Sequence, residues 1–132
     1  YENIEFLGLV KKEDLPAMLA GCTALVFPSI WYEGMPLTII EAFASGTPVI
    51  ASKLGAMESM IEDGYNGLHF EAGNKNDLKE KLALWQNMEL LHKTTYYQNA
   101  RLTYEHNYTP EENLEQLLSL YQSVIDEKNT VT

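Results

Sequence analysis

Residues 28–41 read PSIWYEGMPLTIIE, and this stretch decides how the rest of the chain is interpreted. It follows an apolar run over 24–27 that Pro28 ends, which is typical of a strand covered on both faces of a parallel sheet. A helix is predicted over 36–45, because proline is favoured in the first turn and Gly46 stands just past the end. The stretch therefore predicts a strand that leads through a glycine-containing loop into the N-terminus of a helix.

The start of this predicted helix is a candidate anion site, because the first amides of a helix lack intrahelical partners and point outward with the positive end of the dipole. Glu33 lies just before the helix and Glu41 lies within it. Counted from Leu37, Glu41 falls at i+4 between apolar residues at i+3 and i+7, so we expect it on the face that points toward the sheet. A carboxylate there needs partners that compensate its desolvation, and the hydroxyls of a ribose are one candidate.

Each acid also has a purely structural explanation. An acid just before a helix is usually a partner for the helix dipole, which would account for Glu33 without any ligand. Glu41 could turn outward into water or pair with a buried lysine. From the residues alone, these alternatives stay open beside the ligand-binding interpretation.

Strands and helices continue to alternate outward from this stretch. Strands are predicted over 4–7, 24–27, 48–51 and 67–70, and helices over 13–20, 36–45, 57–61, around 78–85, 88–105 and 110–127. Thr109 and Glu112 fit a capping box at the start of the last helix. The alternation predicts an α/β fold, a parallel sheet with flanking helices, in which ligands bind beyond the carboxyl ends of the strands.

Composition excludes several function classes. Nine Lys and Arg oppose nineteen Asp and Glu among 132 residues, and a net charge of −10 makes the chain a poor partner for nucleic acids or anionic lipid surfaces. Cys22 is the only cysteine, which excludes an internal disulfide framework and a multi-cysteine zinc site and favours a cytoplasmic location. No signal peptide is apparent. Because the chain opens at Tyr1, we expect a piece of a longer protein.

Residues 33–52 resemble the C-terminal domain of GT-B glycosyltransferases of family 4, which carry a Glu-x7-Glu motif with the spacing of Glu33 and Glu41. The flanking residues match as well: PS at 28–29, Gly34 after the first acid, and GTPVIAS at 46–52. Further matches at 6–8, 55, 63–64, 66–67 and 108–121 extend the resemblance over nearly the whole chain. The chain departs from the family at 55–59, which read GAMES where Gly-Gly-x-Pro-Glu is frequent.

The resemblance implies a retaining transferase that uses a nucleotide-diphosphate sugar, without a cofactor and without a metal for binding. By position, it implies that Glu33 is the catalytic residue at the donor sugar, that Glu41 binds the ribose hydroxyls, and that backbone near Val10 borders the base. The remaining donor contacts implied are backbone amides of Gly34, Met35, Leu37 and Thr38.

The resemblance also implies a Rossmann-like domain that is incomplete. Residues 1–132 would form the C-terminal nucleotide-sugar-binding domain of a GT-B fold, without its early part and without the N-terminal domain that binds a sugar or lipid-linked acceptor. We expect the isolated chain to be inactive. The full-length enzyme would be cytoplasmic or act at the inner face of the membrane.

Two alternatives stay open: a non-catalytic nucleotide-sugar-binding module and a GT-B sugar-nucleotide epimerase. The pair of acids favours the transferase, because a module needs only Glu41.

A second expectation concerns association. We expect the isolated chain to self-associate through an unpaired strand edge at 4–7 or an apolar stripe on the last helix, or to be only marginally stable; the stripe comprises Leu114, Leu117, Leu118, Tyr121 and Ile125.

Overall fold

The computed structural model describes residues 3–30 and 36–130, and these form the predicted α/β arrangement. Three parallel strands lie side by side in the order β1-β2-β3. Their bounds are Leu25–Phe27 for β1, Val49–Ser52 for β2 and Gly67–Phe70 for β3. Leu25 lies opposite Val49, which in turn lies opposite Gly67, so the strands are in step and their carboxyl ends meet at one edge of the sheet.

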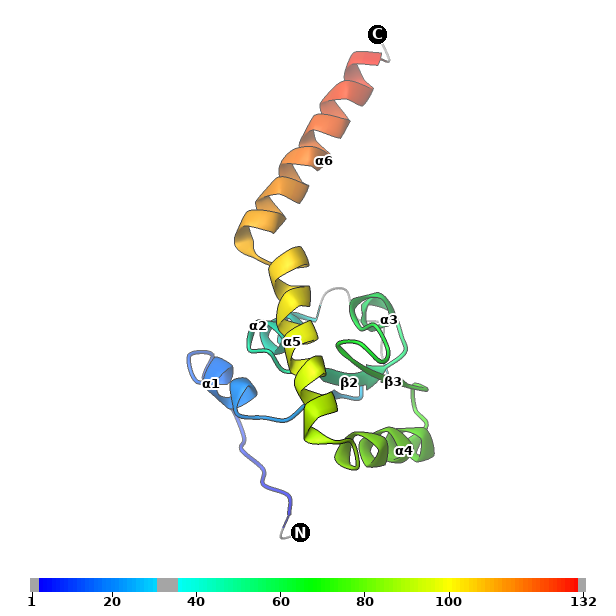
Figure 1. Cartoon of the computed structure of the whole chain (residues 1–132). Helices are drawn as coiled ribbons and strands as arrows, with labels where there is room; N and C mark the ends of the chain where they lie inside the picture. Colours follow the sequence, from blue (N-terminus) through cyan, green and yellow to red (C-terminus); the bar gives the residue numbers. More distant parts are fainter. Residues whose placement is uncertain (1–2, 31–35, 131–132) are drawn as a thin grey trace.

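Helices cover both faces of this sheet (Figure 1): α4 lies on one side and α2 and α3 on the other, and α5 contributes to the apolar clusters on both. The helices are α1 (Leu15–Ala20), α2 (Leu37–Ala44), α3 (Ala56–Met60), α4 (Lys75–Gln86), α5 (Leu90–Asn107) and α6 (Pro110–Thr130). Figure 1 shows α6 projecting away from the body of the molecule. None of the helices in 3–30 and 36–130 combines the length and apolarity needed to cross a membrane.

The central strand explains why the sheet is covered on both faces. All four residues of β2 are buried, and its three apolar residues alternate between two apolar clusters. Val49 and Ala51 join a cluster with α2, α3 and α5, whereas Ile50 joins a cluster with Trp85 of α4 and Tyr96 of α5. Successive side chains of a strand point to opposite faces, so a strand that is buried at every position needs helices on both sides. The predicted fold class is confirmed.

The outer edge of β3 is covered by carboxylates. The Oδ1 atom of Asp63 accepts a hydrogen bond from the amide of His69 at 2.8 Å, and Oδ2 of Asp77 accepts one from the amide of Glu71 at 2.7 Å. The amide of Gly64 donates to the carbonyl of Gly67 at 3.0 Å. These contacts satisfy backbone groups that would otherwise offer an open edge to another chain.

The strand predicted over 4–7 is wrong. No strand of the described residues includes this segment, and its apolar side chains are in solvent, with Phe6 93% exposed. A strand is stable only when its backbone groups pair with a neighbour, and 4–7 pairs with neither β1 nor any other described strand. An apolar run is therefore an insufficient signal without that neighbour.

Several element ends also differ from the prediction. The first helix begins at Leu15 instead of 13, and Asp14 is its N-cap residue. Pro36 is the N-cap of α2 and has an extended backbone, with ψ 101°, so it precedes the first turn instead of opening it. The start of α6 is as predicted, and the amide of Glu112 donates to Thr109 Oγ1 at 3.2 Å.

Candidate functional site

The candidate site lies where β1 leads into α2, at the carboxyl edge of the sheet. β1 ends at Phe27, and α2 begins at Leu37 after the N-cap Pro36. In parallel α/β sheets, ligands bind beyond this edge. Three of the expected site residues, Glu33, Gly34 and Met35, lie outside the described residues, so their predicted roles stay predictions.

The N-terminus of α2 presents amides of the kind that bind anions. Pro36 has no N–H and makes no side-chain cap, and the amide of Ile39 donates to the carbonyl of Pro36 at 3.1 Å. Within the part of the chain that the structure describes, no hydrogen bond uses the amides of Leu37 or Thr38. The first turn of α2 carries no acidic side chain either. The amides of Leu37 and Thr38 and the positive end of the helix dipole therefore face this edge of the sheet, and the first turn places no acidic side chain beside them.

The face of α2 that packs against the core differs from the predicted one. Ile39, Ala42 and Phe43 are fully buried, whereas Leu37 is 66% exposed. These three residues have i, i+3, i+4 spacing and join the cluster that contains Val49 of β2 and Ala100 of α5. The predicted face was wrong because it was counted from Leu37, which stands at the open end of the helix.

Glu41 consequently lies at the border of the buried face, half-buried, one turn after Leu37. Its Oε2 atom is shielded from solvent, yet it has no hydrogen-bond partner among the described residues. Leaving a buried acceptor unsatisfied costs about 1–3 kcal/mol, and more for a charged group. The expectation that this carboxylate needs a compensating partner fits the geometry, and the chain itself supplies none in its described part.

Ser52 provides the second such atom, because its Oγ is also buried without a partner in the described ranges. Ser52 ends β2 and follows Ala51, so its side chain points to the opposite face of the sheet from the cluster that holds α2. The two unsatisfied atoms therefore belong to different sides of the sheet, and Ser52 is not part of the site around α2.

Val10, expected to border the base of a nucleotide, lies in the irregular segment before α1. It is half-buried, whereas its neighbour Leu9 is fully exposed. No hydrogen bond within 3–30 and 36–130 joins Val10 to α2. Its role stays a prediction.

The far end of α2 is held more firmly than its start. Gly46, with φ +71°, follows the helix, and its amide donates to Phe43 O at 2.9 Å, while the amide of Thr47 donates to Ala42 O at 2.8 Å. This pair of bonds is a Schellman motif, which requires a left-handed residue after the helix and explains the glycine. The hydroxyl of Thr47 also donates to Leu19 O at 2.6 Å and so ties this corner to α1.

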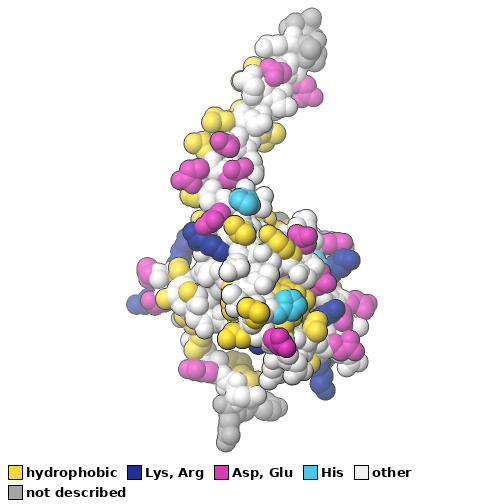
Figure 2. All heavy atoms as spheres, viewed as in Figure 1, with side chains coloured by type: hydrophobic (Ala, Val, Ile, Leu, Met, Phe, Trp, Pro, Cys, Tyr) yellow, Lys and Arg dark blue, Asp and Glu magenta, His cyan; other side chains and the backbone are white. Residues whose placement is uncertain are grey.

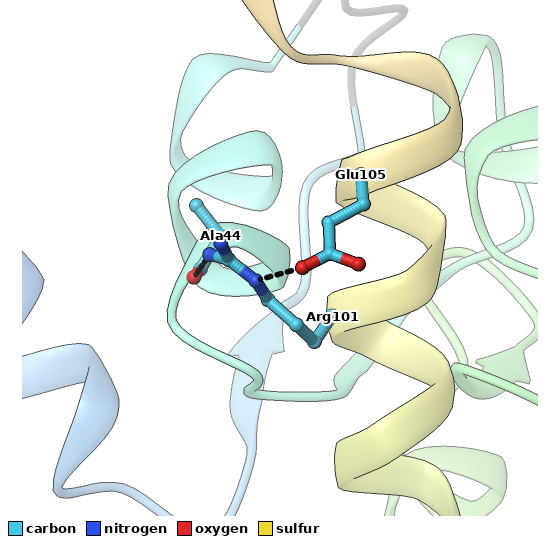
Figure 3. Close-up of polar contacts among 3 residues, drawn as sticks. All are labelled: Ala44, Arg101 and Glu105. Atoms are coloured by element: carbon cyan, nitrogen blue, oxygen red, sulfur yellow. Dashed lines mark hydrogen bonds and ion pairs between the residues drawn. The ribbon is translucent and has the colours of Figure 1, made fainter.

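Sequence reasoning missed one residue at this end of α2. Arg101 of α5 donates from Nη1 to the carbonyl oxygen of Ala44, the last residue of α2, and from Nε to Oε1 of Glu105 at 3.0 Å (Figure 3). Arg101 is the only arginine in the chain, and that rarity is the one signal in the sequence that could have drawn attention to it.

A hollow of about 710 Å³ also adjoins this far end and not the candidate site. It is lined by residues of the ends of α1 and α2 and of α5, including Cys22, Gly46 and Tyr97. Since β1 and β2 begin just after these helix ends, the hollow lies toward the amino ends of the strands. Ligands of α/β sheets bind at the other edge, so size alone does not make this hollow the site.

Most of the chain is similar to known proteins. The family described as glycosyl transferases group 1 matches residues 1–103. An uncharacterized glycosyltransferase of Methanocaldococcus jannaschii is 40% identical over 92 residues, which cover 70% of this chain and 26% of that protein.

Two solved structures are similar in fold. Sucrose-phosphate synthase from Thermosynechococcus elongatus superposes with a TM-score of 0.83 at 26% identity, covering 96% of this chain and 31% of that one. A variant of TarM from S. aureus, in complex with fondaparinux, alpha-GlcNAc-glycerol and UDP, has a TM-score of 0.68 at 30% identity, covering 82% of this chain and 22% of that one. The chain thus spans 22% to 31% of the length of these three relatives.

Proposed function

The chain belongs to the glycosyl transferases group 1 family, and from this membership we propose that it supplies the donor-binding half of the active site of a glycosyltransferase. The donor is a nucleotide-diphosphate sugar. The chain is the C-terminal domain of a GT-B enzyme without its early part, and the acceptor, a sugar or a lipid-linked sugar, binds to the N-terminal domain that is not in this chain.

One observation carries the proposal: the shielded Oε2 atom of Glu41 has no partner within the described residues, and it lies one turn from the amides of Leu37 and Thr38, for which the described residues supply no acceptor either. Residues four apart on a helix are separated by about 6 Å along its axis. One nucleotide can therefore meet both features, with its ribose hydroxyls donating to Glu41 and its diphosphate accepting from the amides.

The chemistry at the sugar rests on the Glu-x7-Glu resemblance. We assign the catalytic role to Glu33, near the reacting centre, with Gly34 and Met35 adding backbone amides beside it. Retention of configuration and membership of family 4 are part of the same proposal. The presence of UDP in the complex of TarM, a structure 30% identical to this chain, supports a nucleoside diphosphate as the leaving group.

The proposal includes no cofactor and no metal for donor binding, because the helix dipole and backbone amides supply the positive potential for the diphosphate. A cytoplasmic location, with the full-length enzyme acting at the inner face of the membrane, stays a prediction from the sequence. So does the inactivity of residues 1–132 on their own.

Calorimetry on the full-length protein tests donor binding directly. UDP, GDP and ADP are titrated in the presence of EDTA, and we expect one of them to bind. The glucose conjugate of that nucleotide is then incubated with the protein. With a sugar or lipid-linked acceptor present, release of the nucleoside diphosphate with transfer of the sugar to the acceptor supports a transferase. An altered sugar still joined to its nucleotide would indicate an epimerase, and an unchanged donor would indicate a binding module. Binding of none of the three nucleotides would overturn the proposal.

A further inference from the structure

α2 carries the donor-binding groups of the proposed site, yet it cannot hold its own orientation. The helix has eight residues, so it is about 12 Å long, and isolated helices of this length are not stable in water. Its N-cap Pro36 contributes no side-chain hydrogen bond. The direction in which Glu41 and the first amides point is therefore set by what α2 contacts along its buried face and at its C-terminal end.

At that end, each of the last four carbonyls of α2 receives a hydrogen bond. Those of Glu41, Ala42 and Phe43 accept from backbone amides at 45–47, immediately after the helix. The carbonyl of Ala44 instead accepts from Arg101 on α5, 57 residues away. Among these bonds, the one from Arg101 is the one that joins the end of α2 to another helix.

The Arg101 side chain is itself held in place. Its Nε donates to Glu105 one turn along α5 (Figure 3), and its guanidinium lies 5.2 Å from the centre of the Tyr104 ring. A planar guanidinium can make both hydrogen bonds at once because its donors point in fixed directions. The Arg101 side chain thus links α5 to the C-terminal end of α2 in a fixed geometry.

We propose that Arg101 is a positioning residue for the donor: it fixes the C-terminal end of α2 on α5 and so aims Glu41 and the amides of Leu37 and Thr38 at the nucleotide. The inference rests on the proposed function.

Direct attraction between the guanidinium and the donor phosphates is the weaker explanation. A charge at one end of a helix about 12 Å long lies beyond the Debye length of about 8–10 Å at physiological ionic strength. The side chains of Arg101 and Glu105 are also about half exposed, which screens them further. Arg101 therefore affects the N-terminal end of α2 through the orientation of the helix and not through its own charge.

Removal of the Arg101 guanidinium leaves α2 packed against α5. Ala100, the neighbour of Arg101 on α5, is fully buried in the cluster with Ile39, Ala42 and Phe43. This contact does not involve the guanidinium, so we expect Arg101→Ala to fold with α2 in place and less firmly oriented. Arg101→Met serves as a second variant, since its apolar stem can still cover the Tyr104 ring while no donor remains.

The test uses the full-length protein and the nucleoside diphosphate that the wild type binds best among UDP, GDP and ADP. Dissociation constants are measured well below each variant's melting temperature. We expect Arg101→Ala and Arg101→Met to weaken binding about tenfold, because a small misplacement of binding groups is costly. Arg101→Lys, which can still donate to the Ala44 carbonyl, is expected to stay within about threefold of the wild type. Lys79→Ala, which removes an exposed positive charge from α4, is the matched control and should change nothing.

The measured affinities distinguish failure of the proposed donor-binding function from failure of the positioning role of Arg101. A wild type that binds none of the nucleotides defeats the proposed function, and the inference with it. A wild type that binds, with both Arg101→Ala and Arg101→Met equal to it in affinity, overturns only the inference. A loss that Arg101→Lys does not recover at all, or that Lys79→Ala reproduces, overturns it as well, because the contact with Ala44 would then not be what matters.

Discussion

Gly67 lies so close to Val49 that a Cβ atom built on Gly67 would stand 1.9 Å from the Val49 carbonyl oxygen. The two residues are opposite one another in the β2–β3 pair, so the obstacle is backbone at the centre of the sheet and cannot rotate away. Any side chain at position 67 must push the strands apart. The glycine is therefore required by the close approach of two strands.

The first prediction follows from this contact. We expect Gly67→Ala to lower the free energy of unfolding by about 3 kcal/mol or more, at the upper end of the cost of overpacking a core. Denaturant unfolding followed by circular dichroism measures it. Gly21→Ala is the control, because Gly21 has a negative φ and its nearest neighbours, at 3.6 Å, leave room for a methyl group. Equal stability of the Gly67 and Gly21 variants would contradict the prediction.

Glu41 supplies a prediction for two quantities, the affinity for nucleotide and the stability of the ligand-free protein. Glu41→Ala removes the acceptors for ribose hydroxyls, and loss of hydrogen bonds to a charged group costs roughly 1.5–3 kcal/mol, or about ten- to a hundredfold in nucleotide affinity. The ligand-free protein should lose little stability, because Oε2 has no partner to lose among the described residues. Calorimetry and thermal unfolding of the same sample measure both quantities.

The control for this variant is Glu80→Ala, which removes an exposed carboxylate from α4. It should leave both affinity and stability unchanged. If Glu41→Ala instead destabilised the ligand-free protein strongly while affinity held, the acid would be a structural residue and the ribose role would be wrong.

A helix or strand could be predicted from the sequence where the residues that determine it are adjacent in the chain, and not where a distant segment decides it. The strands at 24–27, 48–51 and 67–70 and the helix after Pro36 follow from short apolar runs and from the breakers beside them, and all are present within a residue or two. The segment 4–7 has the same local signal but forms no strand, because strand formation is decided by a neighbour that local sequence does not contain.

The candidate site likewise combines features set by adjacent residues with features set by distant ones. The positions of Leu37, Thr38 and Glu41 on one helix start were predictable, whereas the buried face of α2 was not, because its phase is set by β2 and α5. Arg101 could not be predicted as a partner of Ala44, since 57 residues separate them and only the packing of α5 on α2 brings them together. The catalytic assignment to Glu33 is untested by the structure.

Glu33 is expected to affect turnover more than nucleotide binding. Its proposed partners are on the sugar, near the charge that develops in the transition state, so Glu33→Gln should lower kcat while the affinity for the nucleoside diphosphate stays nearly intact. Steady-state kinetics of the full-length enzyme and calorimetry with the nucleotide alone give the two numbers. A near-normal kcat would count against the catalytic role.

Tyr96 predicts a loss of stability at alkaline pH. Burial between Trp85 and the sheet raises the pKa of its phenol above 10.0, and the negative charge of Asp63 raises it further. Because the folded state holds this proton more tightly than the unfolded state, the stabilisation is complete below pH 10 and is lost as the pH rises through the raised pKa.

Tyr96→Phe keeps the edge-to-face contact with Trp85, whose ring centre is 5.3 Å away, and removes the titrating group. Urea unfolding between pH 8 and pH 11 should therefore show a shallower alkaline decline for this variant, by about 1.4 kcal/mol for each unit of pKa difference. Tyr121→Phe, on the exposed surface of α6, is the control and should follow the wild type. Identical alkaline profiles for all three proteins would show that Tyr96 is not the responsible group.

The last prediction concerns α6, whose surface combines apolar and acidic side chains where it projects from the body of the molecule (Figure 2). The stripe predicted from its sequence is exposed along its length; it comprises Leu114, Leu117, Leu118, Tyr121 and Ile125. An exposed apolar stripe of this kind marks a surface that favours association, and we expect residues 1–132 to self-associate. Light scattering over a range of concentrations measures the mass. Replacing both Leu117 and Ile125 by serine should restore a monomer, whereas Phe6→Ser, which alters the exposed segment 4–7, should not. A monomeric wild type at high concentration would refute the expectation, and a monomer produced by Phe6→Ser would move the contact from α6 to the N-terminal segment.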